Sequence, residues 1–138
     1  MGDRNNQFLT ILVVEDLDDQ AEYLTYLLKR RGFNVVVAKN AEKALNQLNT
    51  LDIDCALVDI NLGEGMDGFE LMYEIRDQIK YRNLPIISVT AYCSREIEND
   101  IIEKGFTDLM VKPYSYDQLY NALDKHLYPN NQYMMRGD

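Results

Sequence analysis

The sequence predicts one α/β domain in which a five-stranded parallel sheet is covered by helices on both faces. Short apolar segments typical of strands alternate along the chain with longer segments of helical periodicity. The strand-like segments are apolar throughout, as expected for strands buried on both faces of a parallel sheet. A length of 138 residues suits a single domain with one core. Right-handed crossovers then favour a doubly wound sandwich.

Five segments have the composition of buried strands. The first three span about residues 10–14, 34–38 and 53–58. The fourth begins at Pro85, and a short fifth segment reaches Lys112. Each is bounded by polar or turn-forming residues, which limits it to strand length.

Five segments have helical periodicity. The first spans about residues 19–31 before Gly32, and the third spans about residues 69–79. Asn40, Ser94 and Ser115 are predicted N-caps of the other three, with Ser115 and Gln118 forming a capping box and Gly105 ending the fourth helix. The residues predicted to face the core include Met72, Ile75 and Ile79 in the third helix, Ile97, Ile101 and Ile102 in the fourth, and Leu119, Ala122, Leu123 and Leu127 in the fifth.

Composition and charge restrict the classes of function. The formal net charge of −9 argues against binding to nucleic acid or to an anionic membrane surface. The two cysteines, Cys55 and Cys93, have the spacing of neither a zinc site nor a redox pair. No apolar segment has the length of a membrane span or the flanks of a signal peptide. We therefore expect a cytoplasmic protein with reduced thiols.

The folded domain is expected to span residues 9–128. Residues 1–8 and the polar, aperiodic residues 129–138 are expected to be disordered. His126, the only histidine, lies on the last predicted helix and is expected at the surface.

Polar side chains follow the predicted strands where each strand ends. Glu15 and Asp16 follow the first strand, Asp59 the third, Thr90 the fourth and Lys112 the fifth. Ligands of doubly wound folds bind outside the carboxyl ends of the strands. The sequence therefore predicts that these side chains form one site at that edge of the sheet.

The acidic residues of this group suit a divalent cation. Several carboxylates close together cannot all ionise cheaply without a proton or a cation. Mg²⁺ prefers oxygen ligands and usually takes only one or two carboxylates. We predict Asp16, Asp59 and the backbone carbonyl of Asn61 as direct ligands, with Glu15 acting through water; Mn²⁺ can take the same place. The alternative is that Glu15 and Asp16 only favour the start of a helix.

The remaining residues suit phosphorylation of a carboxylate. An oxygen of Asp59 that attacks phosphorus gives an acyl phosphate. Catalysis is then mainly positioning and charge stabilisation of the phosphoryl oxygens. We predict that Lys112, the Thr90 hydroxyl and the Ala91 backbone N–H contact these oxygens. Taken singly, Lys112 could be a solvated lysine and Thr90 an ordinary strand residue.

These residues lie in segments that resemble the receiver domain of bacterial two-component response regulators. The matching segments are Val14–Asp16, Leu57–Leu62, Met66–Gly68, Val89–Ala91 and Val111–Pro113, within a similarity that covers about residues 9–128. The resemblance implies a flavodoxin-like fold with strand order 2-1-3-4-5. It also implies Mg²⁺-dependent transfer of a phosphoryl group to Asp59 from a histidine kinase or a phosphotransfer protein. Such a protein is not a conventional enzyme, since it catalyses only its own phosphorylation and slow dephosphorylation.

The resemblance also implies a cis peptide bond between Lys112 and Pro113, which X-Pro chemistry permits. Three departures from the family pattern concern the site. Leu109 stands where an aromatic switch residue coupled to the threonine is common. The loop from Asp59 to Gly68 is one residue longer than usual and lacks the usual proline. Asn61 and Tyr92 occupy positions that tune dephosphorylation, and Tyr92 is predicted to shield an acyl phosphate from water.

The output of such a domain would be a change of surface. The resemblance points to the face made by the fourth helix, fifth strand and fifth helix, about residues 94–127, as the site for an unidentified downstream protein or a second copy of the chain. Tyr114, Tyr116 and Tyr120 are candidates for contacts on this face. The alternative is that these tyrosines pack into the core.

Three other classes of protein remain as alternatives. A pseudo-receiver would keep the fold as a binding module without being phosphorylated, and Leu109 gives that reading some support. A small aspartyl-nucleophile phosphatase normally has a second aspartate two residues after the nucleophile, where this chain has Asn61. A flavodoxin would need a phosphate-binding loop after the first strand, and the sequence has none there.

Overall fold

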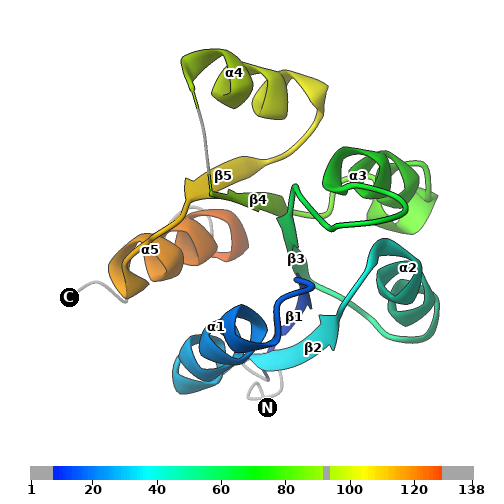
Figure 1. The fold of residues 1–138 in the computed structure, drawn as a ribbon. Helices are drawn as coiled ribbons and strands as arrows, with labels where there is room; N and C mark the ends of the chain where they lie inside the picture. Colours follow the sequence, from blue (N-terminus) through cyan, green and yellow to red (C-terminus); the bar gives the residue numbers. More distant parts are fainter. Residues whose placement is uncertain (1–7, 92–93, 129–138) are drawn as a thin grey trace.

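The computed structural model describes residues 8–91 and 94–128. The elements in chain order are β1 (Thr10–Val14), α1 (Asp18–Arg30), β2 (Asn34–Ala38), α2 (Ala41–Thr50), β3 (Cys55–Asp59), α3 (Gly68–Arg76), the 3₁₀ helix η2 (Ile79–Tyr81), β4 (Ile86–Thr90), α4 (Arg95–Lys104), β5 (Asp108–Val111) and α5 (Tyr116–Leu127). The strands form one parallel sheet in the order β2-β1-β3-β4-β5 (Figure 1). The predicted doubly wound fold and its strand order are confirmed.

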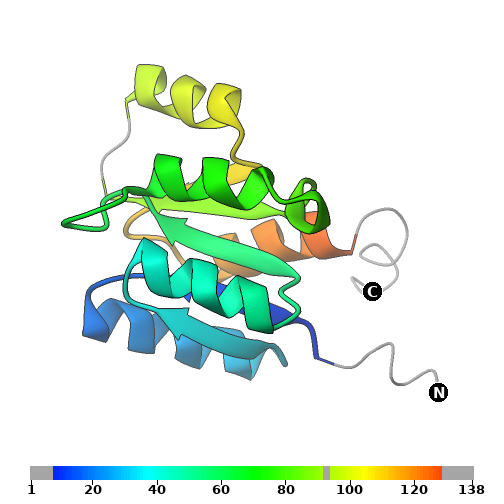
Figure 2. The ribbon, with the colours of Figure 1, turned by 90° about the vertical axis from the view of Figure 1, so that its right-hand side faces the viewer.

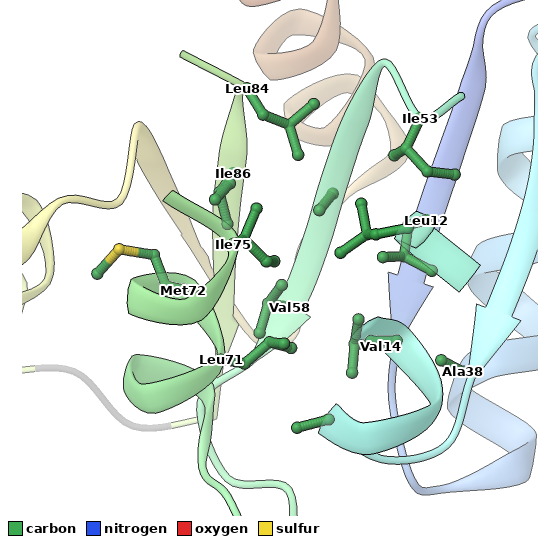
Figure 3. Close-up of a cluster of buried hydrophobic side chains, with 14 of the residues drawn as sticks. Leu12, Val14, Ala38, Ile53, Val58, Leu71, Met72, Ile75, Leu84 and Ile86 are labelled. Carbon is green, nitrogen blue, oxygen red and sulfur yellow. The ribbon is translucent and has the colours of Figure 1, made fainter. Parts of the chain in front are cut away.

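The helices bury their apolar sides on opposite faces of the sheet. On one face, α2 and α3 and part of α4 cover side chains of β1, β3 and β4, including Leu12, Val58 and Ile86 (Figure 3). On the other face, α1 and α5 cover the alternate residues of the same strands, such as Val13 and Leu57. Burial on both faces is the reason why these strands are continuously apolar.

The predicted helix starts are confirmed by their hydrogen bonds. Asn40 Oδ1 accepts from the backbone N–H of Lys43 at 2.8 Å, and Ser94 Oγ accepts from that of Ile97 at 3.2 Å. Ser115 and Gln118 form the predicted capping box. A second capping box, between Asp67 and Glu70 at the start of α3, was not predicted. Gly105 ends α4 with a φ of 131°, which is a conformation that favours glycine.

The third predicted helix is too long. It ends at Arg76 rather than at residue 79, because the backbone leaves the helical conformation at Gln78, where ψ is 128°. The helical periodicity therefore does not extend to Ile79, which is 81% exposed. The first helix is shifted by one residue, to Asp18–Arg30, and β3 begins at Cys55 rather than at residue 53.

The predicted inward face of the fourth helix is also wrong in part. Ile101 is fully buried, but Ile97 is 36% and Ile102 is 45% exposed. The cause is the position of α4 next to β5, the last strand of the sheet (Figure 1). Only a narrow face of the helix, which carries Ile101, packs against the core there. His126 is not a free surface residue either, since its Nε2 lies 2.8 Å from Asp108 Oδ2 and its side chain is only 18% exposed.

The predicted disorder concerns residues 1–8 and 129–138, of which only Phe8 is described by the structure, so it stays a prediction. Within residues 8–91 and 94–128, no helix has the length and apolar character needed to cross a membrane.

Candidate functional site

Parallel strands place the predicted site residues at one edge of the sheet. The loops that follow β1 and β3 both leave from this edge (Figure 2). The parallel pairing of β3 with β4 places the end of β4 beside them, since Asp59 is in register with Val89. Val14 of β1 is in register with Val58 of β3, so the residues that follow each strand are neighbours. Thr90, the last residue of β4, is in register with Val111, which precedes Lys112.

Three carboxylates meet at this edge. Carboxylate oxygens of Glu15, Asp16 and Asp59 all lie within 4.8 Å of one another. Glu15 and Asp59 are only 4% and 6% exposed, and Asp16 is the most accessible of the three. Burial raises the pKa of Glu15, and the charge of Asp59 raises it further. A bound cation would relieve this repulsion between the carboxylates.

The donor set fits Mg²⁺. All three groups are hard oxygen ligands, and the accessible Asp16 leaves room for the water molecules that Mg²⁺ usually retains. A Cβ atom at Gly63 would lie 3.2 Å from Asp16 Oδ2, so glycine at this position leaves space beside the carboxylate.

Lys112 forms ion pairs with two of these carboxylates. Its Nζ lies 3.1 Å from Asp59 Oδ2 and 3.2 Å from Glu15 Oε1, and it also donates a hydrogen bond to Gln20 Oε1. Burial lowers the pKa of Lys112, but the hydrogen bonds and charges of Asp59 and Glu15 outweigh this effect and leave its pKa raised. Lys112 is therefore a fixed positive charge beside Asp59. The Lys112–Pro113 peptide bond is cis, as predicted.

The second oxygen of Asp59 is held by its own loop. The backbone N–H of Asn61 donates to Asp59 Oδ1 at 2.9 Å. The backbone N–H of Gly68 donates to the carbonyl oxygen of Ile60 at 3.0 Å, which brings the start of α3 against the end of β3. Both carboxylate oxygens of Asp59 thus have a donor, and the side chain is oriented before any ligand binds.

The other predicted residues are distributed around this centre. Thr90 is 3% exposed at the end of β4, and its backbone carbonyl accepts from the N–H of Lys112 at 2.8 Å. Ala91 is exposed and lines a cavity of about 660 Å³ beside Lys112. Leu109 is half-buried on β5 and has no hydroxyl to offer Thr90. Tyr92 lies outside the described residues, as does Cys93.

Gln20 belongs to the site, although nothing in the sequence indicates this. It is the third residue of α1, a position where a glutamine is an ordinary surface residue. Its contact with Lys112 joins residues 92 positions apart in the chain. Gln20 lines the same cavity of about 660 Å³, together with Glu15, Asp19, Tyr23, Leu24, Val89, Ala91, Lys112, Pro113 and Tyr114.

Comparisons with known proteins agree with this arrangement. The chain is 37% identical over 118 residues to a 14.6 kDa uncharacterised protein of Leptolyngbya boryana, covering 86% of this chain and 89% of that one. It is 33% identical over 119 residues to the transcriptional regulatory protein ZraR of Escherichia coli, covering 86% of this chain but only 26% of ZraR.

A solved structure with a similar fold is the receiver domain of a sensor histidine kinase from Pseudomonas aeruginosa, which has a magnesium ion coordinated in its active-site cleft. It is 26% identical, with a TM-score of 0.80, and the match covers 87% of this chain and 98% of that one. The model of the response regulator receiver domain matches residues 11–124. Because that match spans most of the chain, the protein belongs to the family of response regulator receiver domains of two-component signalling.

Proposed function

We propose that Asp59 is the phosphoryl acceptor of this receiver domain. The observation that carries the proposal is the environment of its carboxylate. One oxygen, Oδ2, lies 3.1 Å from Lys112 Nζ, and the buried group also belongs to a cluster of three carboxylates within 4.8 Å. A carboxylate that contacts an ammonium group and belongs to a cluster suited to a cation is positioned to attack a phosphoryl group.

The reaction follows from these positions. An oxygen of Asp59 forms a bond to phosphorus, and the bond between phosphorus and the donor's leaving group breaks; from a phosphohistidine, the imidazole nitrogen leaves with the electron pair. Lys112 and the hydroxyl of Thr90 stabilise the charge on the phosphoryl oxygens, with the backbone N–H of Ala91 as a further donor. Asp16, Asp59 and the carbonyl of Asn61 would hold Mg²⁺, with Glu15 acting through water, and the ion supplies charge neutralisation at the phosphoryl group.

The donor is a histidine kinase or a phosphotransfer protein. Membership of the receiver family supports this assignment, and so does the similarity to a receiver domain of a sensor histidine kinase. Receiver domains are generally signalling modules, so we expect the chain to catalyse only its own phosphorylation and slow loss of the phosphoryl group. Asn61 and Tyr92 are the residues proposed to set the rate of that loss.

Phosphorylation by a small donor tests the proposal. The protein is incubated with acetyl phosphate and Mg²⁺, and its intact mass is measured with and without later treatment with hydroxylamine, which cleaves acyl phosphates. We expect the addition of one phosphoryl group that hydroxylamine removes. Asp59→Asn is expected to abolish it, whereas Glu64→Gln, an exposed acid in the same loop, is expected to leave it unchanged. No addition in the parent protein would favour a pseudo-receiver.

The phosphatase alternative is not favoured by the family match. The residue two positions after Asp59 is Asn61, whose side chain is an amide and cannot act as an acid or base. Repeated release of phosphate from added monoesters, many times per protein molecule, would contradict this assignment.

A groove on the predicted output face is the proposed site for a downstream partner. It has a volume of about 730 Å³ and lies between α4, β5 and α5. Its lining includes the apolar residues Ile102, Leu109 and Val111, and its charged residues are the acids Glu98, Glu103 and Asp108 and the base Lys125. Asp108 is already paired with His126, so Glu98 and Glu103 are the acids that a partner could contact. This composition suits an amphipathic segment with basic residues, and a second copy of the chain is the other candidate occupant.

The three tyrosines predicted for this face take other positions. Tyr114 and Tyr120 are half-buried and pack against the core under α1 and α5, and Tyr120 donates a hydrogen bond to the carbonyl of Leu27 at 2.9 Å. Tyr116 is 56% exposed. The alternative prediction, that the tyrosines pack into the core, is therefore confirmed for Tyr114 and Tyr120. None of the three tyrosines is among the described residues that line the groove.

Hydrogen–deuterium exchange tests whether phosphorylation changes the groove. We expect altered protection of α4 and β5 after phosphorylation, and unchanged protection of β2 at the opposite end of the sheet. Light scattering on the same samples identifies a second copy as the occupant if the mass doubles. Identical exchange of α4 and β5 in both states would contradict a role for this face in output.

A further inference from the structure

Lys112 uses all three of its hydrogen-bond donors in the structure. An ammonium group has three N–H bonds. The acceptors are Asp59 Oδ2, Glu15 Oε1 and Gln20 Oε1, and the lysine side chain is only 18% exposed. The three acceptors come from different elements: the end of β3, the loop after β1, and the first turn of α1. The ammonium group of Lys112 is thus fixed both in its distance from Asp59 and in the orientation of its N–H bonds.

The three acceptors differ in what happens to them during the proposed reaction. Asp59 and Glu15 both belong to the carboxylate cluster, where a cation and a phosphoryl group would compete for their oxygens. Contacts of Lys112 with these carboxylates must therefore change as the reaction proceeds. Gln20 is neutral and lies outside the cluster, so its contact with Lys112 can persist throughout.

The position of Gln20 makes it a rigid support. It lies in α1, whose buried residues Leu24, Leu27 and Leu28 pack against the core. The Gln20 side chain is half-buried and lines the cavity of about 660 Å³ that Lys112 also lines. A side chain held by a packed helix keeps a catalytic group near its productive geometry better than one in a loop.

We infer that Gln20 is a positioning residue that holds the ammonium group of Lys112 directed at the phosphoryl group on Asp59. The inference rests on the proposed phosphorylation of Asp59. It assigns to the first turn of α1 a part in the chemistry that its sequence does not indicate. Without Gln20, the third N–H of Lys112 would donate its hydrogen bond to water. The ammonium group would then adopt orientations that are not directed at Asp59.

Two substitutions of Gln20 separate the hydrogen bond from the shape of the side chain. Gln20→Met keeps the length but removes the acceptor, whereas Gln20→Glu keeps an acceptor oxygen. With acetyl phosphate and saturating Mg²⁺, we expect Gln20→Met to lower the maximal phosphorylation rate by roughly fivefold to twentyfold. We expect Gln20→Glu to stay within about threefold of the parent. Glu22→Met, an exposed neighbour on α1, is the matched control and is expected to leave the rate unchanged.

A double-mutant cycle shows whether Gln20 acts through Lys112. If it does, Gln20→Met has little further effect when Lys112 is already replaced by methionine. The side-chain ¹⁵N ammonium signal of Lys112 gives a second readout. We expect this signal in the parent protein and in Gln20→Glu, and we expect it to be lost in Gln20→Met because the released N–H exchanges with water.

Several results would overturn the inference. These are a parental rate in Gln20→Met, an equal loss of rate with and without Lys112, or an ammonium signal that Gln20→Met leaves unchanged. Failure of the parent protein to accept phosphate would instead contradict the proposed function, and the ammonium signal would still test the contact itself.

Discussion

Gly68 packs directly against the backbone of Asp59. A Cβ atom at position 68 would lie 2.7 Å from the carbonyl oxygen of Asp59 and 2.8 Å from the Cα of Ile60. Both neighbours are backbone atoms, so a side chain at this position could be accommodated only by moving the end of β3 or the start of α3. Glycine at position 68 therefore allows α3 to begin close to the candidate phosphoryl acceptor.

Gly68→Ala is expected to lower the free energy of unfolding by about 1–3 kcal/mol, because the added methyl group overpacks a backbone contact. It should also slow phosphorylation, since the end of β3 carries Asp59. Urea unfolding and the acetyl phosphate assay measure the two effects. Gly65→Asn is the control: its Cβ meets nothing within 4 Å, and asparagine tolerates the positive φ of 87°. Equal stability of Gly68→Ala and the parent would contradict the close approach.

Ser88→Ala is expected to stabilise the protein. The hydroxyl of Ser88 is buried in β4 and has no hydrogen-bond partner among the described residues. Removing an unsatisfied buried hydroxyl should raise the free energy of unfolding by roughly 0.5–1.5 kcal/mol. Ser115→Ala should instead lower the free energy of unfolding by about 1 kcal/mol, because Ser115 caps α5. A loss of stability in Ser88→Ala, measured by urea unfolding, would show that the hydroxyl is satisfied.

Arg76→Met is expected to destabilise the protein by roughly 2–4 kcal/mol. The Arg76 guanidinium donates to the carbonyl oxygens of Gly105, Arg82 and Leu84 and to Thr107 Oγ1, at 2.8 to 3.1 Å. These bonds join the end of α3 to the segments that enter β4 and β5. Methionine would leave partly buried carbonyl groups unpaired. Arg82→Met, with an exposed side chain, should change the unfolding midpoint little; similar losses in both variants would contradict the role of Arg76.

Asp16→Asn is expected to weaken Mg²⁺ binding by about tenfold or more, because it removes one charge from the cluster. Mg²⁺ should raise the melting temperature of the parent, and a chelator should reverse the increase. Both effects should be much smaller in Asp16→Asn. Titration calorimetry and thermal melts measure them, with Asp19→Asn as a nearby acidic control on α1. Unchanged Mg²⁺ affinity in Asp16→Asn would place the ion elsewhere.

Tyr114 is expected to make stability fall in alkaline solution. Burial, with smaller effects of Tyr23 and Glu15, raises the pKa of Tyr114 to about 12. An unfolded tyrosine ionises near pH 10. Between these values the unfolded state binds fewer protons than the folded state, so stability falls as the pH rises from about 10 to 12. Tyr114→Phe should reduce this fall in urea unfolding measured across that range, whereas Tyr116→Phe, at an exposed position, should not.

Much of the candidate site could be predicted from the sequence because its residues are placed by their position relative to the strand ends. Glu15, Asp59, Thr90 and Lys112 each stand at or just after the end of an apolar strand, and parallel pairing brings such ends together whatever the details of packing. The N-caps at Asn40, Ser94 and Ser115 are local in the same sense, since each cap bonds to a residue three positions away.

Other features depend on how distant segments pack against one another. Helical periodicity placed Ile79, Ile97 and Ile102 in the core, but periodicity says nothing of where a helix stops or how much of its surface a neighbour covers. Contacts between distant segments leave no local signal, as with Gln20 and Lys112 or Asp108 and His126. Local sequence is therefore enough to specify the strand ends and the chemical groups they carry. Which additional side chains hold those groups in place was decided by packing, because that depends on distances across the fold.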